Sequence, residues 1–129
     1  MEVEKYIDEI RAVLAPVEGI GYAYLFGSAL KRLLPDSDID LLLGGDLDFD
    51  EKTRLAMELS LRLKRNVDIV LAKEASYELI LKVLSQGRPI LVHKQKSLRE
   101  DYFRNYFLYD ANTSLRNIRQ ERIRRAYGS

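Results

Sequence analysis

Four short apolar segments, each bounded by turn-forming residues, alternate along this chain with longer stretches of helical periodicity. The segments span residues 20–25, 38–43, 66–72 and 88–93. Their length and their content of leucine, isoleucine, valine and tyrosine predict β-strands. Helices are predicted over residues 6–14, 28–34, 50–65 and 75–86, and from about residue 98 onward with a break near 112–113. This alternation predicts an α/β or α+β fold with a sheet of about four strands flanked by helices.

The size and composition limit the classes of protein to consider. The 129 residues are enough for one domain, 1–129, in which residues 98–129 form a helical C-terminal extension. The absence of cysteine and the single histidine, His93, exclude disulfides, thiolate chemistry and a multi-histidine zinc site. No apolar run approaches the roughly 20 residues that cross a bilayer, so no membrane association and a cytoplasmic location are expected.

Carboxylates interrupt the second apolar segment at alternate positions. Side chains alternate across a strand, so Asp38 and Asp40 should project from one face, roughly 6.5–7 Å apart along the chain, while Ile39 and Leu41 face the core. Neighbouring carboxylates repel, and burial without partners raises their pKa values. One divalent cation, or a pair about 3.5–4 Å apart, would relieve this repulsion, and Mg²⁺ prefers such hard oxygen ligands. Asp68, a lone acid in the third segment, would join them if the two strands are neighbours.

Two further motifs flank these aspartates. Asp48-Phe49-Asp50 repeats the same spacing, but a loop and a helix N-cap at Asp50 explain it without a metal. Gly27-Ser28 lies where a predicted strand ends and a predicted helix begins, so its backbone N–H groups and hydroxyl could contact a phosphate. Lys31 and Arg32, one turn further, either neutralise phosphate charge or lie on an exposed helix face. The sequence therefore predicts a phosphate site facing a metal site.

The combined pattern resembles that of the nucleotidyltransferase superfamily that includes DNA polymerase beta and kanamycin nucleotidyltransferase. The resemblance rests on Phe26-Gly27-Ser28, Ser37-Asp38-Ile39-Asp40-Leu41 and Val67-Asp68-Ile69-Val70. The chain length is typical of the minimal branch, the MNT proteins, which are encoded beside a HEPN-domain toxin and act as its antitoxin. A polymerase-beta-like fold with a mixed sheet is implied.

The resemblance also implies the reaction and the residues that perform it. An acceptor hydroxyl would attack the α-phosphate of ATP and release pyrophosphate; in HEPN/MNT pairs the acceptor is a tyrosine of the toxin. Asp38 and Asp40 would hold two magnesium ions, and Asp68 would aid metal binding or deprotonate the hydroxyl. The implied nucleotide contacts are Gly27, Ser28, Lys31, Arg32 and Ser37.

Two alternative functions follow from other features. Nine residues, 29–37, separate Gly27-Ser28 from Asp38 where the family has ten, and residues 30–34 contain no glycine. This shortened loop favours a non-catalytic antitoxin that neutralises its toxin by binding alone. Nucleotidyl transfer to a small molecule such as an aminoglycoside is the third hypothesis, although the chain is short for an added acceptor-binding domain.

Three features at the C-terminal side complete the predictions. Arg88 and His93 match the arginine–histidine spacing of HEPN ribonucleases, but that motif lies on a helix and residues 89–92 predict a strand, so the match is taken as coincidence. An aromatic cluster at helical spacing predicts core packing, with a partner-binding surface as the alternative; it comprises Tyr102, Phe103, Tyr106, Phe107 and Tyr109. Five arginines between residues 116 and 125 either form a solvated helix end or contact an acidic partner or nucleic acid. A homo-oligomer is also possible.

Overall fold

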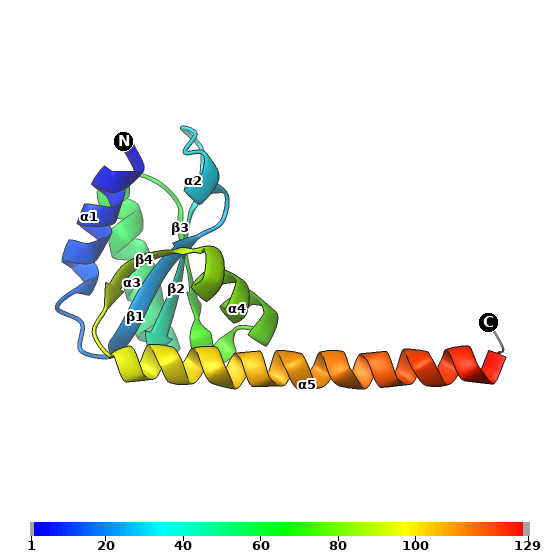
Figure 1. Ribbon diagram of the computed structural model, residues 1–129. Coiled ribbons are helices and arrows are strands. Elements are labelled where there is room, and N and C mark those ends of the chain that lie inside the picture. The colour runs from blue at the N-terminus through cyan, green and yellow to red at the C-terminus, as the bar shows by residue number, and fades with distance from the viewer. Residues whose placement is uncertain (1, 128–129) are drawn as a thin grey trace.

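The computed structural model describes the backbone of residues 2–127 and the side chains of residues 3–113, 116, 117 and 122. Six helical elements, one of them a short 3₁₀ turn, surround four strands (Figure 1). In chain order the elements are α1 (Glu2–Leu14), β1 (Ile20–Phe26), α2 (Ser28–Lys31), β2 (Ile39–Gly45), α3 (Phe49–Leu63), β3 (Val67–Leu71), η1 (Ala72–Glu74), α4 (Tyr77–Gln86), β4 (Arg88–Val92) and α5 (Gln95–Tyr127).

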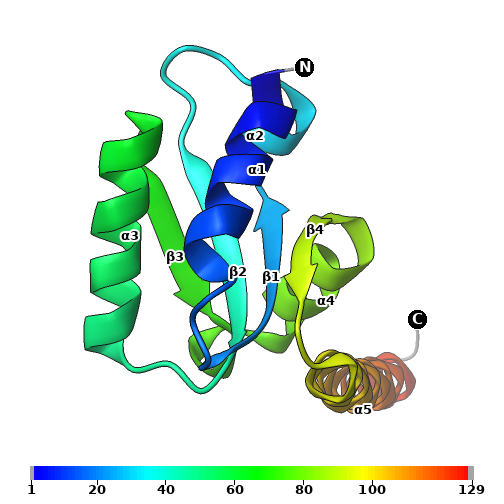
Figure 2. The ribbon, with the colours of Figure 1, turned by 90° about the vertical axis from the view of Figure 1, so that its left-hand side faces the viewer.

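The four strands form one mixed sheet in the order β3-β2-β1-β4 (Figure 2). Strand β1 pairs antiparallel with β2 and with β4, whereas β2 and β3 are parallel. Parallel neighbours need a long crossover, and α3 supplies it. Pro89 lies in β4, an edge strand, where its missing N–H is tolerated. The predicted fold class and the four-stranded mixed sheet are confirmed.

The sheet has a core on each face. Helices α1 and α3 cover one face, where Ile39, Leu41 and Leu43 of β2 are buried among their side chains. Helix α4 and the beginning of α5 cover the other face, around Tyr22 and Leu42. Because side chains alternate along β2, Asp40 shares the second face with Leu42. The Asp40 carboxylate therefore lies on the opposite side of the sheet from the larger core.

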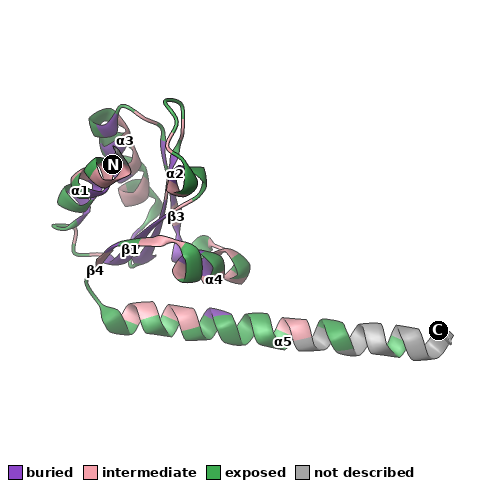
Figure 3. Ribbon diagram, turned by 45° about the horizontal axis from the view of Figure 1, so that its top comes forward, coloured by how far each residue is buried: buried purple, intermediate pink, exposed green. Residues whose placement is uncertain are grey.

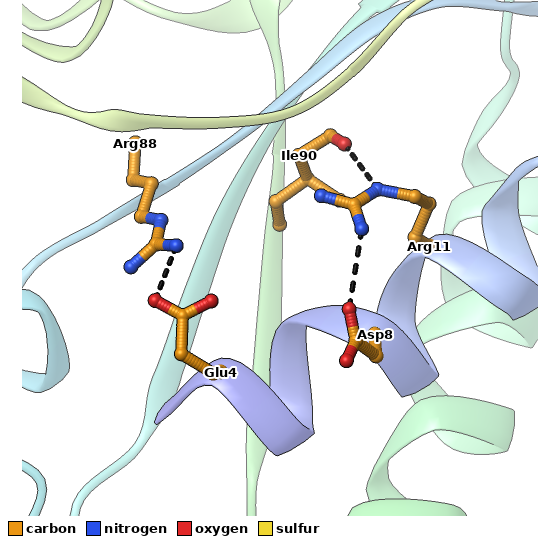
Figure 4. A network of polar contacts seen from close by, with 5 residues as sticks. All are labelled: Glu4, Asp8, Arg11, Arg88 and Ile90. Atoms are coloured by element: carbon orange, nitrogen blue, oxygen red, sulfur yellow. Dashed lines mark hydrogen bonds and ion pairs between the residues drawn. The ribbon is translucent and has the colours of Figure 1, made fainter. Parts of the chain in front are cut away.

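Polar contacts tie α1 to the exposed edge of the sheet (Figure 4). Arg11 Nε donates a hydrogen bond to the carbonyl oxygen of Ile90 at 2.8 Å, and its Nη1 contacts Asp8 at 3.2 Å. Arg88 forms an ion pair with Glu4. Since β4 is an edge strand, these contacts occupy a carbonyl that no neighbouring strand could reach.

Strand β4 also shows where Arg88 and His93, the two residues with HEPN-like spacing, lie in the fold. Arg88 begins strand β4, and His93 follows the strand with its Nδ1 3.2 Å from the carbonyl oxygen of Ile20. The two side chains therefore do not share a helix. The prediction that this spacing is coincidental is confirmed.

Several helix boundaries differ by a few residues from the predicted ones, and two of the differences have a clear physical cause. The N-cap of α3 is Asp48 rather than Asp50: the Asp48 carboxylate accepts from the Glu51 N–H at 2.8 Å, and the Glu51 carboxylate accepts from the Asp48 N–H at 3.3 Å. This reciprocal capping box satisfies two donors at once, so it outcompetes a cap at Asp50. Helix α2 ends at Lys31 instead of residue 34, because Arg32 is extended and Pro35 disfavours helical geometry in the residue before it.

Helix α5 is continuous from Gln95 to Tyr127, so the predicted break near residues 112–113 is wrong (Figure 1). It contains neither glycine nor proline, and asparagine and threonine lower helix propensity only modestly. Its first turns pack against α4 and the sheet, where the Tyr22 hydroxyl donates to Asp101 at 2.8 Å. Further along, the helix projects well beyond the rest of the molecule.

The aromatic cluster on α5 does not pack in the core as predicted. Tyr102 is half-buried, but Phe103, Tyr106, Phe107 and Tyr109 are 46–72% exposed. Most of the part of α5 that is coloured by burial in Figure 3 is exposed. Helical spacing shows which residues share a face, not whether another element covers it.

Of the five arginines between residues 116 and 125, Arg116 and Arg122 are exposed. Arg119, Arg124 and Arg125 fall outside the side chains that the structure describes. Within residues 2–127, none of the helices has both the length and the apolar character to cross a membrane.

Candidate functional site

The three predicted aspartates come together at one end of the sheet. Asp40 on β2 and Asp68 on β3 are register partners in the parallel pair, so both project from the same face. Asp38 lies two residues before Asp40, just ahead of β2. Burial raises the pKa of Asp40, and the negative charges of Asp68 and then Asp38 add to that shift. Asp38 and Asp68 are therefore close enough to Asp40 to disfavour its charged form.

Gly27 lies directly against these carboxylates. Phe26, the last residue of β1, is the register partner of Asp40, and Gly27 follows it with φ +87° and ψ −164°. This backbone geometry is essentially restricted to glycine. A Cβ atom at Gly27 would overlap the Asp40 carboxylate oxygen and would lie 3.2 Å from its Cγ. The structure thus places the Gly27-Ser28 backbone and the Asp40 carboxylate in contact across the strand pair.

A cavity of about 500 Å³ opens beside Gly27-Ser28. One wall is formed by Gly27, Ser28 and Lys31, and the opposite wall by Lys82 and Gln86 of α4. Apolar side chains complete the lining; they are Phe26, Leu30, Leu79 and Val83. A cavity that joins two lysines and a glycine-serine backbone to apolar walls suits a molecule with an anionic part and a flat apolar part.

The other predicted nucleotide contacts are placed less directly. Arg32 is exposed and does not line the cavity. Ser37 is half-buried, and its hydroxyl accepts a hydrogen bond from the Leu34 N–H at 2.8 Å. In this arrangement Ser37 closes a turn of the loop between α2 and β2. Nucleotide contacts by Arg32 and Ser37 remain predictions.

The carboxylates were also predicted to hold metal. Among the described residues, no group of three histidine, cysteine or acidic side chains is close enough to form a metal cage. The chemistry of the donor set nevertheless fits Mg²⁺: all donors are carboxylate oxygens, and the mutual repulsion at Asp40 is what a cation would relieve. Asp38 and Asp68 are exposed, so their side chains have room to turn toward an ion.

Sequence reasoning missed the contribution of α4. The segment 75–86 predicts a helix, but only the sheet order, with β4 beside β1, brings that helix next to α2. Ile80 and Val83 are buried, while Lys82 and Gln86, one turn apart, are exposed at the cavity. The spacing of Lys82 and Gln86 was a visible signal. It could not be connected to Gly27-Ser28 without the topology.

Comparison with known proteins places the site in a family. A family profile described as polymerase beta, nucleotidyltransferase, matches residues 8–96, which span more than half of the chain and include all three aspartates. No curated protein sequence matches the chain.

Several solved structures share the fold. A toxin–antitoxin structure with AMP-PNP is 24% identical, with a TM-score of 0.74, and covers 91% of this chain and 97% of that chain. A Shewanella oneidensis structure of a tri-AMPylated HEPN toxin in complex with an MNT antitoxin is 23% identical, with a TM-score of 0.71, and covers 93% of this chain and 97% of that chain. An MntA–HepT toxin–antitoxin structure gives 23% identity, a TM-score of 0.70 and the same shares of the two chains. The chain has the fold of these antitoxins, and it belongs to the polymerase beta nucleotidyltransferase family.

Proposed function

We propose that this protein transfers AMP from ATP to a hydroxyl group, a tyrosine, of a partner HEPN toxin and thereby acts as its antitoxin. The observation that carries the proposal is the contact between Gly27 and Asp40, which joins a phosphate-binding backbone to a cluster of carboxylates. Structures of the same fold support the substrate and the partner, since one contains AMP-PNP and another a tri-AMPylated HEPN toxin.

The cavity accounts for ATP binding. The backbone of Gly27 and Ser28 approaches the triphosphate, and Lys31 and Lys82 neutralise its charge from the two walls. The base packs against apolar side chains such as Leu79 and Val83 of α4. Arg32 and Ser37, on the loop between α2 and β2, supply further contacts to the phosphates. This orientation directs the α-phosphate toward Asp40.

The transfer is a displacement at the α-phosphorus. The acceptor oxygen forms a bond to phosphorus, the bond from phosphorus to the bridging oxygen breaks, and pyrophosphate leaves with the electron pair. Asp68, exposed at the edge of the sheet, accepts the proton of the attacking hydroxyl. Asp38 and Asp40, with Asp68, would hold two Mg²⁺ ions, which supply neutralisation of charge on the phosphate oxygens and a lower pKa for the acceptor.

The test combines the protein, ATP, Mg²⁺ and a candidate HEPN partner, with intact-mass spectrometry of the HEPN protein. We expect mass increments of one or more adenylyl groups, which Asp38→Ala or Asp40→Ala abolishes. Asp50→Ala is the matched control, because Asp50 is an exposed aspartate of the other D-x-D motif and lies in the first turn of α3. Absence of any adenylyl increment with the wild-type protein would refute the proposal.

The exposed aromatic face of α5 favours a second candidate, an antitoxin that works by binding alone. Phe103 and Phe107 are 65% and 72% exposed, and such side chains are common in protein–protein interfaces. The two functions separate in cells that express the toxin. If the Asp38→Ala, Asp40→Ala double variant neutralises the toxin as well as the wild type does at equal protein levels, binding suffices. If it fails while still binding the toxin, transfer is required.

A further inference from the structure

Arg65 lies in the short connection between α3 and β3 and reaches across to the loop between α2 and β2. Its Nη1 atom is 2.7 Å from the carbonyl oxygen of Leu34, 3.3 Å from that of Pro35 and 3.0 Å from that of Ser37. The guanidinium group also stacks over the ring of Tyr6 on α1, 5.0 Å from the ring centroid. One half-buried side chain therefore links three elements that are distant in sequence.

The loop that Arg65 contacts is itself closed into a tight turn. The Ser37 N–H donates to the Leu34 carbonyl at 3.1 Å, and the Ser37 hydroxyl accepts from the Leu34 N–H at 2.8 Å. This loop connects Gly27-Ser28 to the first aspartate in only nine residues, 29–37. Its path therefore determines where Asp38 stands relative to Gly27-Ser28.

The backbone on both sides of Asp38 is held by two consecutive residues. Arg65 binds the carbonyl of Ser37, the residue before Asp38, and the Asn66 carbonyl accepts from the Ile39 N–H, the residue after it, at 2.9 Å. Asp38 is exposed and precedes β2, so it lacks a partner in the registered β2–β3 ladder. Residues 65 and 66 therefore supply the backbone contacts around Asp38 that ladder hydrogen bonds supply further along β2.

We infer that Arg65 is a positioning residue for the carboxylate of Asp38, acting through the loop backbone rather than by touching the nucleotide. Stacking of the planar guanidinium on the Tyr6 ring holds Nη1 at the three carbonyl oxygens, and the flexible, non-planar ammonium group of a lysine cannot reproduce that stacked geometry. The inference rests on the proposed function, because Asp38 is given a catalytic role there. Arg65 lies outside the sequence motifs of the family, so the inference adds a residue to the proposed site.

The first test measures metal binding, independently of catalysis. Mn²⁺, used as the probe for the carboxylate site, is titrated into wild-type protein, Arg65→Lys and Arg65→Met and followed by electron paramagnetic resonance. We expect Mn²⁺ affinity to fall about tenfold in both variants, at the lower end of the loss that follows when a group orienting metal ligands is removed. Arg62→Met is the matched control: Arg62 is an exposed arginine in the last turn of α3 that pairs only with Glu58 among the described residues, at 3.5 Å. It should bind Mn²⁺ like the wild type.

The second test measures turnover at a temperature where melting curves show every variant folded. Arg65→Lys should lower kcat for AMP transfer about tenfold and raise the Mg²⁺ concentration for half-maximal activity, with little change in KM for ATP. A merely structural role would lower the melting temperature and leave the Mg²⁺ dependence unchanged. If Arg65→Met does not fold, Tyr6→Leu, which removes the ring beneath the guanidinium, should give a smaller change in the same direction.

The outcomes separate this inference from the proposed function. Wild-type Mn²⁺ affinity and turnover in Arg65→Lys and Tyr6→Leu would overturn the inference even if AMP transfer is observed. Absence of Mn²⁺ binding to the wild-type protein would overturn it too. If the wild type binds Mn²⁺, Arg65→Lys weakens that binding and no AMP transfer occurs, the proposed reaction fails while the positioning of Asp38 stands.

Discussion

Substituting Gly27 with alanine perturbs the contact on which the proposed site depends. The backbone at Gly27 has φ +87° and ψ −164°, a region that residues with a Cβ atom rarely occupy. Forcing alanine into it costs about 1–3 kcal/mol of folding free energy. That loss should lower the melting temperature by roughly 3–6 °C for each kcal/mol in a chain of this length.

The larger effect should be on turnover. The new Cβ would overlap a carboxylate oxygen of Asp40 and lie 3.3 Å from the Asp40 Cβ, so the carboxylate or the Gly27 backbone must shift. A displacement on the order of 1 Å at a reacting site costs about 100-fold in rate. We therefore expect Gly27→Ala to reduce AMP transfer about 100-fold at a temperature where the variant is fully folded, measured by quantifying adenylylated HEPN partner over time.

Gly45→Ala provides the matched control. Gly45 also has a positive φ, +128°, and a Cβ there would meet the backbone of Gly19 and Gly21 at the opposite end of β2. The control should lose comparable stability and keep its rate of AMP transfer. If Gly27→Ala transfers AMP at the wild-type rate, or if Gly45→Ala loses as much rate as Gly27→Ala, the contact with Asp40 is not part of the site.

Three further predictions follow from the same geometry. Asp40→Asn should raise the melting temperature in metal-free buffer. The wild type, unlike this variant, should also become more stable as pH falls from about 7 toward 4, because the pKa of Asp40 in the folded protein lies above its ordinary value of 3.8. Melting curves across this pH range check both expectations. Lys82→Gln should raise KM for ATP about tenfold with little change in kcat, because it removes one charged phosphate contact from the cavity wall. Lys73 is an exposed lysine on η1, so Lys73→Gln should leave KM unchanged in the same steady-state assay. Tyr22→Phe should destabilise the protein by about 1 kcal/mol through loss of the 2.8 Å hydrogen bond to Asp101, as denaturant titration will show; an unchanged midpoint would mean that α5 is held by packing alone.

Local patterns are informative about the three aspartates because the strand period is short and regular. Alternation predicts Asp38 and Asp40 on one face from the sequence alone. The sequence predicted that Asp68 would join them only if the two strands are neighbours, and the structure meets that condition by pairing β3 parallel to β2. The Asp48–Glu51 spacing of a capping box was also present in the sequence. It was overlooked because Asp50 is an equally acceptable N-cap residue type.

Long-range features could not be predicted in this way. The contacts of Arg65 with Leu34 and Ser37 join residues about thirty positions apart, and no periodicity marks them. The wall that Lys82 contributes depends on the strand order, which places α4 beside α2. The exposure of Phe107 could not be predicted either, because helical spacing does not show which side of α5 the neighbouring α4 contacts; Tyr109 lies against Tyr77 of α4, whereas Phe107 is 72% exposed.

The proposed reaction moves the α-phosphoryl part of ATP, and not the γ-phosphoryl group, to a HEPN partner. Parallel reactions with ATP labelled at the α-phosphate and ATP labelled at the γ-phosphate, each with Mg²⁺ and a candidate HEPN partner, distinguish these two transfers. We expect label on the HEPN protein from α-labelled ATP only, and none with the Asp38→Ala, Asp40→Ala double variant. Label from γ-labelled ATP, or equal α-label with the double variant, would refute transfer of AMP by the carboxylate site.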